Sequence, residues 1–322
     1  MPIKPATHIE TVIARVQSKS AAARSRLVAS WGRSMLSHGL DPAHSGVPQF
    51  CSAGEVATRR DALGRVMMIA APKLDRLFEL VGTSGCGIAL TDSEGVVIDH
   101  RFSDADAPVF AGWGLSLGAD WSEAAEGTNG IGTCLAEQRP LTIHRNEHFM
   151  ARNTAMSCID APIYGADGNI IAALDVSSAR ADQTETINGL IAAMVSQTAR
   201  KIEADNFRAN FTGARIIVAD HDDTDSAMLL AVDQDDLIVG ATRGARKAYG
   251  FALEGAIAPT PAVDLFGRED GASGFEKAER AAVVRALVRS NDNVSDAARS
   301  LGVSRATLYR RMKRLGLTSA SD

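Results

Sequence analysis

The chain has few cysteines, and their positions form no pair. Among its 322 residues, only Cys51, Cys86, Cys134 and Cys158 are cysteines. No two of them have the C-x-x-C spacing of a zinc ligand pair, and four scattered thiols do not indicate a disulfide framework. We therefore predict no metal site and no cofactor, and we expect the chain to work in a reducing cytoplasm.

Long apolar runs and a phosphate loop are also missing. No segment approaches the roughly 20 apolar residues needed to cross a membrane, and the N-terminus lacks the continuous apolar core of a signal peptide. There is no G-x-x-x-x-G-K-[ST] motif, and the glycine-rich run Gly127–Gly132 has no lysine. We expect no membrane partner and no enzymatic activity.

Negative charge dominates the chain as a whole, but one segment is basic. Lys and Arg total 34, Asp and Glu total 39, and the formal net charge is −5. Between Glu276 and Leu317, however, basic residues outnumber acidic residues by ten to four. A basic module on an acidic body is typical of a regulator that binds nucleic acid with one end only.

The basic segment has the pattern of two helices joined by a tight turn. Ser295 is placed to cap the first helix, Gly302 to end it in a left-handed conformation, and Ser304 to cap the second. Three apolar residues of the second helix recur at i, i+4 and i+7 and predict one buried stripe: Leu308, Met312 and Leu315. The helix before this pair has an apolar stripe of its own: Ala281, Val284 and Val288.

The exposed side of the second helix suits phosphates and guanine edges. We predict a helix-turn-helix whose DNA-contacting residues are Ser304, Arg305, Ala306, Thr307, Tyr309, Arg310, Lys313 and Arg314. The alternative is an ordinary helical hairpin with a solvated basic side. Agreement among caps, turn, stripe and charge favours the helix-turn-helix.

This segment resembles the C-terminal DNA-binding domain of the Fis family, which is also found at the end of bacterial enhancer-binding activators. The matching residues are Asn293, Ser295, Ala297–Arg299, Leu301–Arg305, Thr307–Arg310 and Leu315–Leu317. The resemblance implies that the domain dimerises and that its last helix enters the major groove of a double-stranded operator. We assign residues 274–322 to this domain and residues 257–273 to a linker.

Upstream, the hydrophobic period changes from that of helices to that of strands. Two hairpins are predicted, Gly87–Thr91 with Val96–His100 and Met156–Tyr164 with Ile170–Val176. Helices are predicted over His8–Gln17, Ala21–Leu40, Ala53–Val81 with an interruption near Pro72, and Gln183–Arg208. The fold class is therefore α+β, with an antiparallel sheet domain, flanking helices and an all-α C-terminal domain.

The sheet region resembles a GAF sensory domain, and residues 30–178 look like the N-terminal region of acetoin-catabolism-type activators. The resemblance is carried by Ser30-Trp31, Gly39–Pro42, Trp121–Glu123, Glu126–Asn129, Glu147–Phe149, Cys158 and Leu174-Asp175, among others. Two predicted strands around Asp233–Asp236 resemble the opening of a PAS domain. The implied plan is an N-terminal helical region at 1–80, a GAF-like domain at 81–182, a signalling helix at 183–210 and a partial PAS-like segment at 211–256.

Activators of this kind usually place an ATPase between sensor and helix-turn-helix. Without a phosphate loop, we expect this chain to bind DNA as a homodimer and either to contact RNA polymerase or to block it. A small-molecule effector would bind the GAF-like domain. Residues that suit such a pocket, and equally a plain core, are Trp113, Trp121, Asn129, Ile143, His148, Phe149, Cys158 and Asp160.

Two other functions stay open. Cys158 with His144 or His148 has the ligand types of a metal or redox sensor, since nitrogen and thiolate ligands suit zinc or iron. The alternative is a purely structural role, with a histidine that hydrogen-bonds the backbone and a buried free thiol that packs like a small apolar side chain. The chain could also be a co-regulator that pairs with a full-length, ATPase-bearing activator.

Overall fold

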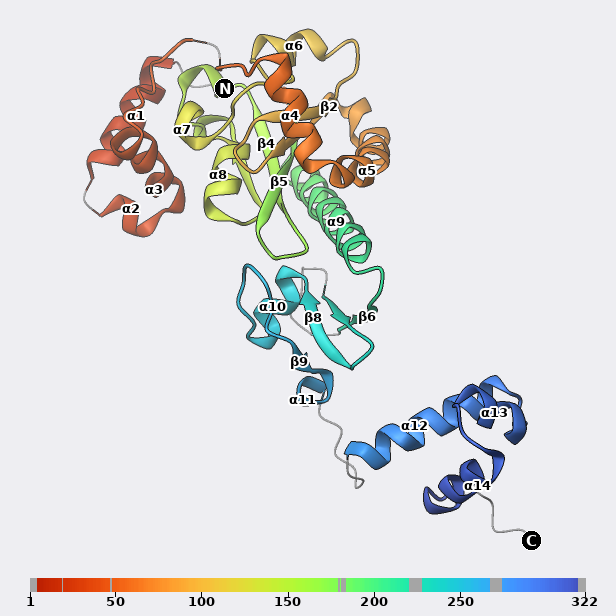
Figure 1. The fold of residues 1–322 in the computed structure, drawn as a ribbon. Helices are drawn as coiled ribbons and strands as arrows, with labels where there is room; N and C mark the ends of the chain where they lie inside the picture. The colour runs from red at the N-terminus through yellow and green to blue at the C-terminus, as the bar shows by residue number, and fades with distance from the viewer. Residues whose placement is uncertain are drawn as a thin grey trace. The chain divides into compact units, whose positions relative to one another are not determined.

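The computed structural model describes residues 5–18, 20–46, 48–178, 180, 184–219, 228–266 and 274–317. It divides into two units, Met1–Leu265 and Phe266–Asp322, which we describe separately (Figure 1). Within these ranges, no helix is long and apolar enough to cross a lipid bilayer.

The centre of the first unit is a five-stranded antiparallel sheet. Its strands are β1 (Cys86–Asp92), β2 (Val97–Arg101), β3 (Leu141–His144), β4 (Ser157–Tyr164) and β5 (Ile170–Ser178), in the order β2-β1-β5-β4-β3. Gly95 closes the β1–β2 turn with φ of +93°, which residues with a side chain rarely adopt. Both predicted hairpins are confirmed.

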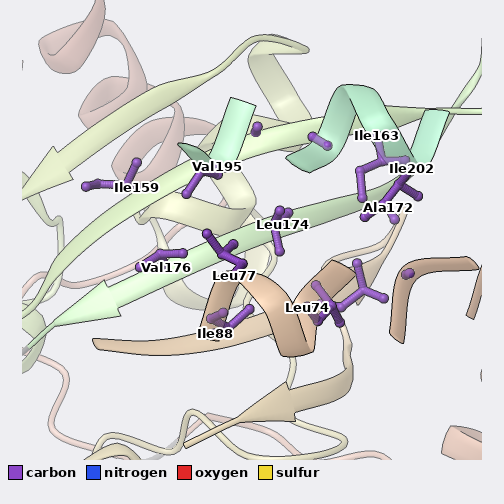
Figure 2. Close-up of a cluster of buried hydrophobic side chains, with 14 of the residues drawn as sticks. Leu74, Leu77, Ile88, Ile159, Ile163, Ala172, Leu174, Val176, Val195 and Ile202 are labelled. Atoms are coloured by element: carbon purple, nitrogen blue, oxygen red, sulfur yellow. The ribbon is translucent and has the colours of Figure 1, made fainter. Parts of the chain in front are cut away.

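One face of this sheet is covered by α5 (Arg65–Val81) and α9 (Glu185–Asn210). Successive side chains of a strand point to opposite faces, so alternate strand residues reach these helices. Figure 2 shows the resulting core, in which Ile88, Ile159, Leu174 and Val176 of the strands meet Leu74, Leu77, Val195 and Ile202 of the helices. The helix predicted to carry the signal, α9, is thus part of the core of the sensory domain.

The helix predicted over Ala53–Val81 breaks at Gly64 and not near Pro72. Helix α4 spans Ala53–Leu63 and α5 begins at Arg65, while Gly64 between them has φ of +30°. Pro72 lies inside α5. It is exposed, so water can hydrate the carbonyl group that loses its backbone donor.

Four short helical segments precede α4: α1 (Pro5–Gln17), α2 (Ala21–Arg24), α3 (Arg26–Gly32) and the π-helical turn η1 (Arg33–Ser37). The single helix predicted over Ala21–Leu40 was therefore wrong. Ser25 has an extended backbone, and its hydroxyl accepts a hydrogen bond from the backbone of Val28, so it caps a new helix. This N-terminal layer packs against the loop before β4 through a cluster that contains Val12, Val28, Trp31, Phe149 and Met150.

The other face of the sheet is covered by α6 (Ala107–Gly112), α7 (Glu123–Glu126) and α8 (Gly130–Glu137). Of the 3-10 turns, η2 (Gly82–Ser84) directly follows α5, and η3 (Arg145–Glu147) and η4 (Ala151–Asn153) lie between β3 and β4. On this other face, Ala89 and Cys158 of the sheet pack against Phe110, Trp121 and Ile131. Helices therefore flank the sheet on both faces, which confirms the predicted α+β class.

A second antiparallel sheet follows α9. Its strands, in sheet order, are β6 (Arg215–Val218), β7 (Leu229–Val232), β8 (Leu237–Ala241) and β9 (Thr260–Pro261), with α10 (Arg243–Tyr249) and α11 (Ala262–Phe266) beside them. The described part of the predicted linker, up to residue 266, thus contains β9 and α11, and residues 267–273 lie outside the described ranges.

Arg243 of α10 joins this PAS-like segment to the sensory sheet. Its guanidinium donates hydrogen bonds to the carbonyl oxygen of Gly168 in the β4–β5 turn (3.0 Å) and to Gln138 Oε1 after α8 (2.8 Å). It also lies 4.8 Å from the ring centre of Tyr164 at the end of β4. One side chain therefore contacts three parts of the sensory domain.

The described part of the second unit consists of α12 (Gly274–Arg289), α13 (Val294–Ser300) and α14 (Arg305–Arg314). Helix α13 is capped by Asn293, whose Oδ1 accepts hydrogen bonds from the backbone of Ser295 (3.0 Å) and Asp296 (3.4 Å). The predicted cap at Ser295 was wrong, because the helix begins two residues earlier than that cap implies and Asn293 already accepts hydrogen bonds from its free amides.

Helix α12 packs with a different side from the one predicted. Val283, Ala286 and Leu287 are buried against α13 and α14. Of the predicted stripe, Ala281 and Val284 are half-buried and Val288 is 68% exposed. The helix therefore has two apolar sides, and the unit's own core covers only one of them.

Candidate functional site

The start of α14 is fixed by the turn before it. Gly302 has φ of +66°, and Ser304 Oγ accepts a hydrogen bond from the backbone of Thr307 (3.1 Å). The predicted stripe is buried, with Leu308, Met312 and Leu315 at 0%, 7% and 8% exposure. Because these residues point into the core, the opposite side of α14 faces solvent.

That solvent-facing side is basic. Ser304, Arg305, Ala306, Tyr309, Arg310, Lys313 and Arg314 are exposed, and Thr307 is half-buried. Arg305 lies 5.6 Å from the ring centre of Tyr309. No acidic residue in the described ranges pairs with Arg310 or Lys313. Their charges are therefore free for an anionic partner.

Arg314 differs from the rest of the predicted DNA-contacting set. It forms an ion pair with Glu279 of α12, and Arg311 binds the same carboxylate (Nε to Oε1, 3.3 Å). These two pairs link the last turn of α14 to α12. Arg314 therefore lies at the margin of the basic side.

The predicted effector residues do not all meet in one place. Trp121 and Cys158 belong to the cluster between the sheet and α8, and Trp113 lies half-buried at its edge. Phe149 packs in the separate cluster of the N-terminal layer. Ile143 lines a hollow on another side of α8. His148, Asn129 and Asp160 are buried.

The side-chain amide of Asn129 forms hydrogen bonds that hold the loop before α8. Its Oδ1 accepts a hydrogen bond from the backbone of Gly132 (2.9 Å), and its Nδ2 donates to the carbonyl oxygens of Trp121 (3.0 Å) and Gly127 (2.9 Å). The start of α8 also faces the carboxyl group of Asp160, since a Cβ on Gly130 would lie 2.0 Å from Asp160 Oδ2. The loop is therefore a helix cap, and the Asp160 side chain occupies the space at the helix start that a phosphate would need.

Two carboxyl groups lie side by side in the interior. Asp160 of β4 is paired in register with Asp175 of β5, and both are buried. Ser177 Oγ donates to Asp175 Oδ2 (2.8 Å). Burial raises the pKa of Asp175 to about 7, and burial together with the charge of Asp175 raises the pKa of Asp160 well above its usual range. Among the described residues, neither Asp160 oxygen has a hydrogen-bond partner, and a proton shared with Asp175 would satisfy one of them.

This pair continues into a chain of polar contacts. Ser177 Oγ lies 3.2 Å from Cys158 Sγ, which lies 3.4 Å from His148 Nε2, and His148 Nδ1 lies 3.0 Å from the carbonyl oxygen of Arg145. Ser177 was missed as a candidate site residue. Period-two alternation across the paired strands could have placed it beside Cys158.

The buried pair predicts a pH-dependent stability. Unfolded aspartate has a pKa of about 3.9, so between about pH 4 and about pH 7 the folded chain holds a proton that the unfolded chain releases. We expect the free energy of unfolding to fall by on the order of 2–4 kcal/mol as the pH rises through this window. In Asp160→Asn, the amide can donate to an ionised Asp175, so this slope should flatten in urea unfolding at pH 4.5 to 7.5.

The control for this prediction is Asp104→Asn, because Asp104 is exposed in the loop before α6. It should keep the slope of the unmodified chain. An Asp160→Asn chain that also kept this slope would show that the pair does not share a proton.

The geometry does not favour a metal or thiolate site. His144 is exposed and its Nδ1 bonds to Ser157 Oγ (2.7 Å), so it does not join His148 and Cys158. Burial raises the pKa of the Cys158 thiol and lowers that of His148 to about 4. The described ranges hold no group of three His, Cys, Asp or Glu side chains placed to bind a metal ion.

A buried polar network ties the N-terminal layer to the sensory domain. Ser30 Oγ donates to Glu123 and lies 2.7 Å from Thr128 Oγ1, and Arg33 donates to Glu123 Oε1 (3.0 Å). Asn153 Nδ2 donates to Glu126 Oε2 (3.3 Å).

The expectation that the chain has no G-x-S-x-G motif was wrong. Gly114–Gly118 has the G-x-S-x-G spacing of a hydrolase nucleophile elbow. That elbow needs a strand before the serine and a helix after it, whereas Ser116 follows α6 and precedes an isolated bridge at Ala119. The surroundings of Ser116 therefore differ from the strand–serine–helix arrangement of that elbow.

Two family models match the chain. The model described as "MimR, N-terminal domain" matches residues 8–203, and the model described as "Bacterial regulatory protein, Fis family" matches residues 274–315. In the solved E. coli DhaR(N)–DhaL complex, one chain matches with a TM-score of 0.52 at 12% identity, over 71% of this chain and 78% of that one. That likeness shows a shared fold.

Two of the curated relatives carry names of transcriptional regulators. The acetoin catabolism regulatory protein of Cupriavidus necator is 30% identical over 283 residues, which cover 83% of this chain and 41% of the relative. The propane 2-monooxygenase operon transcriptional activator MimR of Mycolicibacterium smegmatis is 33% identical over 99 residues, 30% of this chain and 17% of the relative. The chain thus matches less than half the length of these relatives. Because the MimR N-terminal model covers more than half of its residues, the chain belongs to the family of transcriptional regulators with this domain, here together with a Fis-type helix-turn-helix.

Proposed function

We propose that the chain is a cytoplasmic transcription regulator that binds operator DNA through α14. The observation that carries this proposal is the exposed basic side of α14, where Arg310 and Lys313 have no acidic partner in the described ranges. Guanidinium and ammonium groups bind phosphates, and arginine also pairs with guanine in the major groove. The capped start at Ser304 would place Arg305 first against the base edges.

We propose that the DNA-binding form is a homodimer. Val288 of α12 is 68% exposed, and it lies on the same side of the helix as the half-buried Val284 and Ala281, one and two turns before it. An apolar side of a helix that the core of its own unit does not cover supports an interface with a second copy. Two recognition helices would then meet half-sites about one DNA turn, roughly 34–36 Å, apart.

We propose that the N-terminal domain senses a small-molecule effector. The names of two relatives, which refer to acetoin catabolism and to a propane 2-monooxygenase operon, support a small organic compound. Such a ligand changes DNA binding only if it binds two conformations of the chain with different affinity. Contact with RNA polymerase, or exclusion of it, would convert DNA binding into regulation.

Selection from a random DNA library tests the DNA-binding assignment. We expect the chain to enrich a sequence with two related half-sites and to bind it at least about a thousandfold more tightly than scrambled DNA, as specific regulators do. Fluorescence anisotropy at one fixed salt concentration measures both affinities. Equal affinity for selected and scrambled DNA would contradict the assignment.

A further inference from the structure

A hollow lies between the N-terminal layer and the α8–β3 segment. Its cavity volume is about 140 Å³. Arg26 and Ser30 line it from α3, Thr133 and Glu137 from α8, and Ile143 from β3. It is thus bounded by three elements that are far apart in the sequence.

The floor of the hollow is polar and held in place. Ser30 and Thr128 are buried, their hydroxyl oxygens lie 2.7 Å apart, and Ser30 donates to the buried carboxylate of Glu123. Thr128 Oγ1 also lies 3.2 Å from the hydroxyl of Ser34 in the π-helical turn. Turns of this type are frequent at functional sites. The hydroxyl groups are therefore oriented before any ligand arrives.

The charges around the hollow balance. Two lining residues are cations, Arg26 and Arg139, and two are anions, Glu137 and Glu147. Arg139 donates to Glu137 (2.7 Å), and Glu147 accepts from the backbone of His144 (2.7 Å). A balanced set does not attract an ion of either sign, but it offers hydrogen-bond donors and acceptors together.

The remaining lining residues include the aliphatic side chains of Leu27, Leu141 and Ile143. We propose that this hollow is the effector site and takes an uncharged small molecule that carries hydroxyl groups beside a short aliphatic part. The inference rests on the proposed sensory function. A molecule held there would contact α3, α8 and β3 at once, so its binding would favour the docked position of the N-terminal layer.

Methyl NMR of the full chain tests the site, because Leu27, Leu141 and Ile143 carry reporter methyl groups. The probe is 2,3-butanediol, with isobutyrate as a charged contrast of similar size. We expect saturable shifts of these three residues with the diol and at least tenfold weaker binding of isobutyrate. Shifts confined to Ile131 and Val97, in the cluster between the sheet and α8, would overturn this site but leave effector sensing intact.

A variant makes the test independent of the shift pattern. Thr142 is exposed and lines the hollow, so Thr142→Trp should fill it without disturbing the core and weaken diol binding at least tenfold. Thr58→Trp on the exposed side of α4 is the matched control and should bind normally. A folded Thr142→Trp chain with unchanged binding, or no response to the diol in the unmodified chain, would overturn the inference. DNA selection decides the DNA-binding assignment separately.

Discussion

Replacing Arg310 and Lys313 together with alanine is expected to weaken binding to the selected DNA at least a hundredfold. Both side chains are exposed on α14, and no acid in the described ranges neutralises them. Each contact of this kind with a base or phosphate is worth about 1–3 kcal/mol, and about 1.4 kcal/mol corresponds to a factor of ten. A dimer would lose each contact twice.

Fluorescence anisotropy at fixed salt measures this effect, and a salt titration should show a shallower slope. The control is the double variant Arg24→Ala with Arg60→Ala, which removes the same charge from two exposed arginines of the first unit. If both double variants lost the same affinity, net charge and not α14 would govern binding. Full affinity in the Arg310 and Lys313 variant would refute the assignment of α14 as recognition helix.

The second large effect is expected for Leu308→Ala. Leu308 has no exposed surface and belongs to the cluster that joins α12, α13 and α14. Truncation of a buried leucine costs about 2–5 kcal/mol, whereas so small a core rarely supplies more than about 3–5 kcal/mol. We therefore expect the second unit to unfold while the first unit stays folded.

Calorimetry of the full chain should show this as the loss or downward shift of one transition, accompanied by loss of DNA binding. Leu190→Ala is the matched control, since Leu190 on α9 is 64% exposed. A Leu308→Ala chain that bound DNA normally and melted like the control would mean that the cluster does not hold α14 in place.

Local signals in the sequence were enough to predict the helix-turn-helix. Ser304, Gly302 and the buried Leu308 act within one or two turns of their own helices, and the structure places them as expected. Errors arose where two local signals competed. Pro72 is tolerated inside α5 because it is exposed, and the predicted helix is interrupted at Gly64 instead. Asn293 caps α13 ahead of Ser295.

The candidate effector site could not be predicted in the same way, because it depends on contacts between distant segments. Ser30 and Thr128 are 98 positions apart and meet only once α3 docks on the loop before α8. Apolar pattern and residue type identify Trp121, Phe149 and Cys158 as buried, but they do not tell which cluster each one joins. The structure assigns Phe149 to the N-terminal layer and the other two to the sheet.

The contacts of Arg243 have a practical consequence for anyone dividing this protein into fragments. A truncation after α9 would remove Arg243, which donates hydrogen bonds to Gln138 and Gly168 and lies over the Tyr164 ring. A truncation should therefore be made after α11, so that the fragment contains both the sensory domain and the PAS-like segment. Chimeras that exchange sensors between regulators of this type should be joined there, not at the end of the long helix.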